Sequence, residues 1–334
     1  MTEQNDLQVK PKIGWKNHIW WVILVMIFWY LLVFSDLGMV LFDDPLYILE
    51  PLIKHTGDMA DSMRFVVWMY LSTITSFIGV FVYTRVTKRN RFIFRSFLPS
   101  APGNRISMLL WGLLLGFLMN FICIACALLN GDIKLFLNFS LYQIPFYMFA
   151  LVCVFFQSSS EELWCRGFLY ERINVKHPLW LAIAINGVLF GLLHAFNPGA
   201  TVLSIADIAL CGISFSFVKW YSGSIWFPMG MHTAWNFTQS LLFGLPNSGM
   251  VSEASVFGLD AATARSSLVY DAAFGVEGAL PAVILDAIPG IVCLVLAAKH
   301  GRLGELKEKC VTPRNDPEGP QPILVEKKRK ESAE

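Results

Sequence analysis

The chain has 334 residues, of which 55% are hydrophobic and only 15% carry a charge. Water-soluble domains carry roughly 25% charged residues, so this composition excludes an ordinary soluble domain and predicts a membrane protein. The net charge of +1 gives no indication of a nucleic-acid partner. The seven cysteines lie mostly within apolar runs and predict no disulfide framework.

Apolar runs of about 20 residues, the length that a helix needs to cross a bilayer, recur along the chain. They predict an all-α, polytopic membrane bundle of about eight transmembrane helices. The expected spans lie near residues 19–41, 65–84, 106–129, 143–172, 179–196, 201–218, 224–245 and 279–298. The first run follows three lysines, as in a signal peptide, but it is long and lacks a small-residue cleavage site, so we expect it to be retained.

The distribution of basic residues predicts the orientation of this bundle. Of the 26 Lys and Arg residues, 22 fall in segments that an eight-span fold places on one side of the membrane; the other four are Lys54, Arg64, Lys134 and Arg265. Loops rich in Lys and Arg stay in the cytoplasm. We therefore expect both termini to be cytoplasmic.

Composition divides the chain into four parts. Residues 1–142 hold the N-terminal transmembrane helices, and residues 143–243 form a core that contains the polar motifs described next. Residues 244–302 comprise an external loop, rich in Ala, Ser and Gly, and the last transmembrane helix. Residues 303–334 are rich in Lys, Glu and Pro and are predicted to be a disordered cytoplasmic tail, because they cannot bury enough apolar surface to fold.

Three polar clusters interrupt the apolar core. They are Glu161, Glu162 and Arg166; Phe190 and His194; and His232 and Asn236. A charged or imidazole side chain at bilayer depth is costly unless it has a partner, so such residues are candidates for a functional site. Carboxylate, imidazole and amide groups are also those that activate water and stabilise an oxyanion. The three clusters together predict an intramembrane hydrolase.

Spacing assigns different tasks to the two glutamates. Glu162 and Arg166 are four residues apart with the acid first, the favourable order for an ion pair on a helix. Glu161 lies about 100° around the helix from Glu162 and is left as the chemical carboxylate. Glu161 and His194 lie at similar distances from the turn near Lys176, so a helical hairpin would place them at similar depth.

The third cluster predicts a pair of hydrogen-bond donors. His232 and Asn236 are four residues apart and share one helix face, where an imidazole N–H and an amide NH₂ could form an oxyanion hole. Close helix packing is expected beside the clusters. Two G-x-x-x-G pairs allow such packing: Gly187 with Gly191, and Gly112 with Gly116.

At these residues the chain resembles the CPBP family of intramembrane proteases, also called the CAAX protease, bacteriocin-processing or Abi family. The family pattern is E-E-x-x-x-R, then F-x-x-x-H, then H-x-x-x-N, and the three clusters match it without departure. The resemblance implies an eight-span fold with a catalytic core at 143–243 and a cavity that opens to the cytoplasm. It also implies that Glu161 and His194 activate water while His232 and Asn236 hold the oxyanion.

Metal dependence is open at this point. We favour chemistry without a metal, because the zinc-binding spacing H-E-x-x-H is absent. Zinc remains possible as a cofactor, and its ligands would then be Glu161, His194 and His232.

The sequence thus predicts an intramembrane endopeptidase of the bacterial plasma membrane whose active site opens to the cytoplasm. Its partners would be the lipid bilayer and a membrane protein or peptide substrate, and a prenylated substrate is implied only by the family name. Two alternatives are a non-enzymatic immunity or scaffold protein with the same fold and a small-solute transporter. The intact motifs argue against the scaffold, and the grouping of polar residues toward one face argues against the transporter.

Overall fold

The computed structural model describes residues 96–252 and 254–309, together with a few isolated positions between residues 21 and 82. Apart from these isolated positions, the first two expected spans lie outside the described residues, as does the tail from residue 310 onward. In chain order the helices and strands are α7 (Ile106–Leu129), β1 (Leu135–Leu137), α8 (Ile144–Glu162), α9 (Tyr170–Asn174), α10 (Leu179–Leu193), α11 (Val202–Ser222), α12 (Trp226–Asn236), β2 (Phe257–Leu259) and α13 (Leu280–Lys299).

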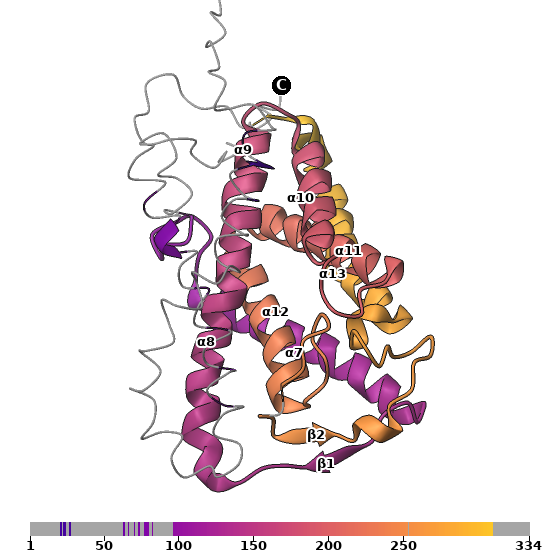
Figure 1. Ribbon diagram of the computed structural model, residues 1–334. Helices are drawn as coiled ribbons and strands as arrows, with labels where there is room; N and C mark the ends of the chain where they lie inside the picture. Colours follow the sequence, from indigo (N-terminus) through magenta and orange to yellow (C-terminus); the bar gives the residue numbers. More distant parts are fainter. Residues whose placement is uncertain are drawn as a thin grey trace, which may run out of the picture.

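Two helices change their winding next to the polar clusters. A π-helical segment, Leu163–Leu169, joins α8 to α9, so that the chain from Leu141 to Asn174 forms one helical rod of 34 residues. This rod is the column formed by α8 and α9 in Figure 1. A second π-helical segment, Phe237–Leu242, continues α12 directly after Asn236. Short π segments inside helices occur frequently at functional sites.

Four helical stretches in the described part of the chain are long and apolar enough to cross a membrane. They are Ile106–Leu129, Leu141–Asn174, Val202–Ser222 and Leu280–Lys299, and each coincides with an expected span. The expected spans at 179–196 and 224–245 also contain helices, α10 and α12. However, α10 has only 15 residues, fewer than the roughly 20 that a perpendicular crossing requires.

Close helix contacts hold the centre of the bundle together. Helix α12 packs against both α7 and α8, and α11 packs against α10 and α13. A Cβ atom added at Gly112 or Gly116 of α7 would come within about 2.2 Å of a backbone carbonyl oxygen of α12, at Phe227 or Met231. The close contact expected at Gly112 and Gly116 is therefore confirmed. The partner helix is α12, which carries His232 and Asn236.

The second G-x-x-x-G pair acts in the same way beside His194. A Cβ atom at Gly187 would lie 2.7 Å from the carbonyl oxygen of Ala209, and one at Gly191 would lie 2.6 Å from that of Ile205. Both carbonyl groups belong to α11. The glycines thus allow α10 and α11 to approach closely next to the F-x-x-x-H motif, as expected.

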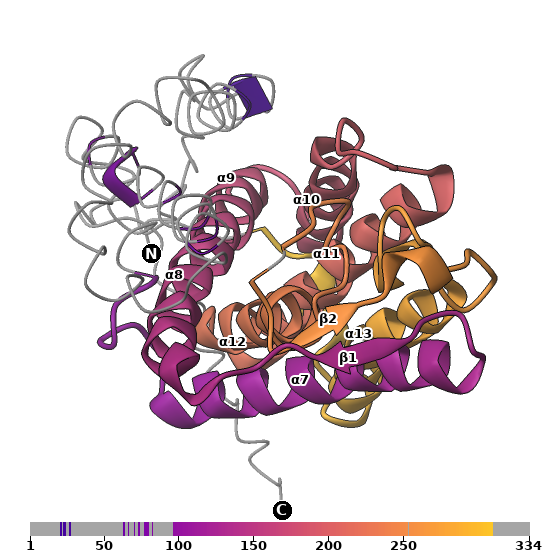
Figure 2. The same cartoon turned by 60° about the horizontal axis from the view of Figure 1, so that its bottom comes forward.

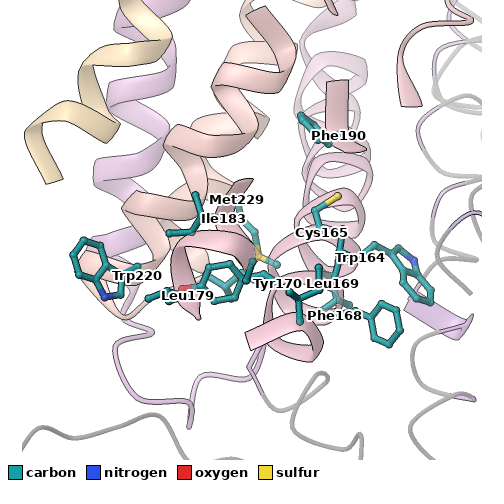
Figure 3. Packing of buried hydrophobic residues seen from close by; sticks show 14 of the residues in the cluster. Trp164, Cys165, Phe168, Leu169, Tyr170, Leu179, Ile183, Phe190, Trp220 and Met229 are labelled. Atoms are coloured by element: carbon teal, nitrogen blue, oxygen red, sulfur yellow. The ribbon is translucent and has the colours of Figure 1, made fainter. Parts of the chain in front are cut away.

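A buried apolar cluster fixes the rod against α10, α11 and α12. Figure 3 shows several of its members, among them Phe168 and Leu169 from the rod, Ile183 and Phe190 from α10, and Met229 from α12. Within a bilayer such contacts stabilise helix packing through van der Waals interactions, because lipid tails are as apolar as these side chains. This packing holds the backbone of all three polar clusters at fixed relative positions.

The segment between α12 and α13 contains a strand and buried aromatic side chains, which its Ala-, Ser- and Gly-rich composition did not indicate. Strand β2 pairs antiparallel with β1, with Leu135 opposite Leu259. This two-stranded ribbon lies at the end of the molecule opposite α9 (Figure 1), and Figure 2 shows the molecule with this end turned forward. Tyr270 and Phe274 of the same segment are fully buried.

The prediction that the tail is disordered from residue 303 onward is wrong for its first residues. Residues Leu303–Lys307 form a 3₁₀-helix. Glu305 accepts hydrogen bonds from Arg302 and Trp220, and the backbone oxygen of Glu308 accepts one from the N–H of Leu179. These bonds hold residues 303–309 against the ends of α10 and α11. Composition could not predict this order, because the partners come from distant parts of the chain.

Candidate active site

Glu162 is the centre of a buried charged cluster. Its Oε1 atom accepts a hydrogen bond from the guanidinium of Arg166 at 3.1 Å and one from Nδ1 of His232 at 3.0 Å. The side chains of Glu162 and Arg166 are both 0% exposed. The expected Glu162–Arg166 ion pair is therefore confirmed, but the same carboxylate also fixes the orientation of a predicted catalytic histidine.

Arg166 makes further contacts with α10 and α11. Its second terminal nitrogen donates to the carbonyl oxygen of Gly212 at 3.2 Å. Its guanidinium lies 4.6 Å from the ring centroid of Phe190 and 5.5 Å from that of Phe215. Cation–π contacts of this kind strengthen when the charge is removed from water. Phe190, predicted to support the site, thus lies against the cation that balances Glu162.

Glu161 occupies a more open position than its neighbour. Its side chain is 19% exposed, against 0% for Glu162. Its Oε1 atom accepts a short hydrogen bond from Gln157, and its Oε2 atom lies 3.9 Å from Nε2 of His232. That distance is too long for a direct hydrogen bond and is typical of polar groups that a water molecule can bridge. Both carboxylates thus face His232, one at each ring nitrogen.

Asn236 makes contacts that its spacing did not predict. Its amide nitrogen donates to Oε1 of Gln157 at 3.0 Å and to Oγ of Ser158 at 3.3 Å. His232 is directed at the two glutamates instead. The two expected oxyanion donors therefore lie on the same helix face, yet each is directed at its own partners.

His194 joins the site through Phe190. Its Nδ1 atom lies 2.8 Å from the carbonyl oxygen of Phe190, and its ring meets the Phe190 ring edge-on with 5.0 Å between the centroids. Phe190 also contacts His232, whose ring centroid lies 6.1 Å from that of Phe190. Phe190 is thus the residue that links the two histidines.

Two residues of the site were missed in the sequence. Gln157 contacts both Glu161 and Asn236. The sequence did contain an indication of this contact, because Gln157 precedes Glu161 by four residues and the two therefore share one helix face. Gln is too common on helices for that spacing alone to have selected it.

The second missed residue is Glu277, which comes from the segment that follows α12. It is only 6% exposed, and its carboxylate accepts hydrogen bonds from Nε1 of Trp235 at 2.9 Å and from the backbone N–H of Ser248. Burial raises the pKa of Glu277, and these hydrogen bonds oppose that shift. Ser248 has a φ of 48°, an unusual value for a residue other than glycine. Glu277 therefore anchors this segment beside Asn236, and nothing in the local sequence predicts it.

Metal-binding geometry was tested on the same residues. Within residues 96–252 and 254–309, no three His, Cys, Asp or Glu side chains gather closely enough to hold a metal ion. Glu161, His194 and His232, the ligands that zinc would use, are not grouped in this way in the described residues.

Comparisons with known proteins agree with the polar motifs. Residues 142–238 match the family described as "Type II CAAX prenyl endopeptidase Rce1-like". The chain is also 38% identical over 93 residues to "Uncharacterized protein YyaK" of Bacillus subtilis (strain 168); the match covers 26% of this chain and 30% of that protein. No solved structure matches. The matched family segment runs from before Gln157 to beyond Asn236 and so contains all three clusters. This match supports the resemblance of residues 142–238 to the CPBP/CAAX protease family.

Proposed function

We propose that the protein is an intramembrane endopeptidase that hydrolyses peptide bonds of membrane-associated proteins or peptides. The observation that carries this proposal is the 3.9 Å separation between Oε2 of Glu161 and Nε2 of His232. A water molecule between them would touch a general base on one side and a hydrogen-bond donor on the other. The burial of Glu162 and Arg166 beneath this position supports it, because a fixed frame favours reaction geometry.

The proposed reaction starts with proton transfer from this water to Glu161, with His194 assisting. The resulting hydroxide attacks the carbonyl carbon of the scissile peptide bond and forms a tetrahedral oxyanion. Glu161 then gives the proton to the leaving nitrogen, the C–N bond breaks, and a carboxylate and an amine are released. Glu162 takes no proton in this scheme. It accepts from Nδ1 of His232 and so keeps Nε2 directed at the reaction centre.

His232 and Asn236 are the proposed oxyanion donors. Nε2 of His232 can donate only if the ring carries both protons, because Nδ1 already faces Glu162. The two adjacent carboxylates supply the negative charge that such an imidazolium requires. Asn236 would supply the second donor from its amide nitrogen.

Substitution of Asn236 and His232 distinguishes the proposed metal-free mechanism from a zinc mechanism. Asn236→Ala should slow turnover by roughly 10²–10³-fold with a smaller change in KM, since an oxyanion donor acts mainly in the transition state. Bound metal should be unchanged. In a zinc enzyme His232→Ala would instead remove a metal ligand. Metal analysis by mass spectrometry of the wild type and His232→Ala checks this: stoichiometric zinc that is present in the wild type and lost in the variant would contradict a metal-free mechanism.

We further propose that the bundle has eight spans with both termini and the active site on the cytoplasmic side of the plasma membrane. Four apolar helices of sufficient length and the segregation of basic residues support this proposal. Reporter fusions after Lys176, Lys219 and the C-terminus should report cytoplasm, and fusions near Gly131 and Ser255 should report the opposite side. A cytoplasmic signal at Ser255 would contradict the eight-span arrangement.

The activity itself is tested by incubating the purified protein with a library of membrane-inserted peptides, with and without a chelator. We expect defined cleavage products in both conditions. An inactive wild-type protein of normal stability would favour a non-enzymatic role for the same fold.

A further inference from the structure

The side chain of Gln157 lies between two residues of the proposed catalytic machinery. Its amide nitrogen donates to Oε1 of Glu161, and its carbonyl oxygen accepts from the amide nitrogen of Asn236 at 3.0 Å. The orientation of the carboxamide follows from its partners. An ionised carboxylate can only accept, so the nitrogen faces Glu161 and the oxygen faces Asn236.

These contacts reproduce those that a substrate peptide bond would make. In the proposed reaction the scissile carbonyl oxygen reaches the Asn236 donor, and the scissile nitrogen receives its proton from Glu161. The Gln157 carboxamide places a carbonyl oxygen and an N–H group on these same two partners. A carboxamide and a peptide bond also share their planar O=C–N geometry.

The amide nitrogen of Asn236 already has partners in this state. It donates to Gln157 and to Ser158, while the Ser158 hydroxyl donates to the same Gln157 oxygen at 3.1 Å. A substrate oxygen that approaches Asn236 from the side of Gln157 must therefore compete with the Gln157 oxygen for this donor. Gln157 is half-buried and lies on the same side of the rod as Glu161, where rotation of its side chain would release it.

We infer that Gln157 occupies the position of the scissile amide in the substrate-free protein and is displaced when a substrate binds. In the substrate-free state its carboxamide spans Glu161 and Asn236, and it takes no part in the chemical step. The inference rests on the proposed function. Beyond that function, it states that the substrate and the Gln157 side chain compete for the same two partners, Glu161 and Asn236.

Displacement has a distinct kinetic consequence. A substrate that must replace the hydrogen bonds of Gln157 binds more weakly by the net worth of about one hydrogen bond, or about 5-fold in affinity. Once the substrate is bound, Gln157 no longer touches the reacting groups, so its loss should leave the chemical step nearly unchanged. If Gln157 instead supported Glu161 and Asn236 throughout the reaction, its loss would slow the chemical step and leave substrate affinity nearly unchanged.

The test is Gln157→Met, which keeps the length of the side chain but removes both hydrogen bonds. The substrate is a fluorogenic peptide with the sequence that the wild type cleaves fastest in the library, presented in phosphatidylcholine vesicles. We expect KM to fall about 5-fold while turnover stays within about 2-fold of the wild type. Ser160→Ala is the matched control on the same helix, because its hydroxyl donates to the backbone oxygen of Gln157; it should change neither parameter.

Other results would overturn the inference. Turnover that slows about 10-fold or more at constant KM would make Gln157 a permanent support, and unchanged kinetics would give it no role in the site. If Gln157→Met does not fold, Gln157→Ala provides the same comparison, since alanine favours the helix. A wild-type protein that cleaves no peptide would instead refute the proposed function, so the two failures are distinguishable.

Discussion

Glu161→Gln should slow turnover by at least about 10²-fold while the protein keeps its fold. The amide retains the size of the carboxylate but cannot take a proton from water, and loss of a general base typically costs about 10²–10⁴ in rate. The side chain is partly exposed, and the amide can still accept the hydrogen bond of Gln157, so little stability should be lost. Initial rates with the fluorogenic peptide and a thermal unfolding curve measure the two effects.

A matched control is Glu308→Gln, an equivalent change at an exposed residue near the start of α10. It should leave both the rate and the unfolding temperature unchanged. Residual proteolysis above about 10% of the wild-type rate in Glu161→Gln would assign the general base to another residue. Glu162 would then be the first candidate, because it also contacts His232.

Glu162→Gln should destabilise the protein by about 3–5 kcal/mol, the typical cost of removing one partner from a buried ion pair. Arg166 is 0% exposed and would keep its charge without a neighbouring carboxylate. Activity should fall as well, because the His232 imidazolium of the proposed mechanism loses the negative charge of its nearest carboxylate. Chemical denaturation in detergent measures the stability, and the fluorogenic peptide measures the activity of the folded fraction.

Two further variants separate these effects. The double variant Glu162→Gln, Arg166→Met should recover much of the stability, since both charges are gone, but not the activity. Glu171→Gln, which breaks the less deeply buried pair with Lys219, should cost less stability than Glu162→Gln. Normal stability with complete loss of activity in Glu162→Gln would reverse the roles that we assign to the two glutamates.

Interactions within one helix could be predicted from the sequence. The Glu162–Arg166 pair and the common face of His232 and Asn236 follow from four-residue spacing, and the G-x-x-x-G contacts follow from the absence of side chains. Hydropathy located helices at each expected span within the described residues. These features depend on helical geometry alone, which the order of residues along the chain fixes.

Contacts between helices were decided by the tertiary structure. The hydrogen bond between Glu162 and His232, and the bridge of Gln157 between Glu161 and Asn236, depend on how α8 and α12 are rotated against each other. Apolar helix surfaces can pack in several rotations, so spacing along one helix does not select the partner on the next. Glu277 shows the same limit for loops: its position beside Trp235 is fixed by buried hydrogen bonds across 42 positions of sequence, for which local spacing holds no information.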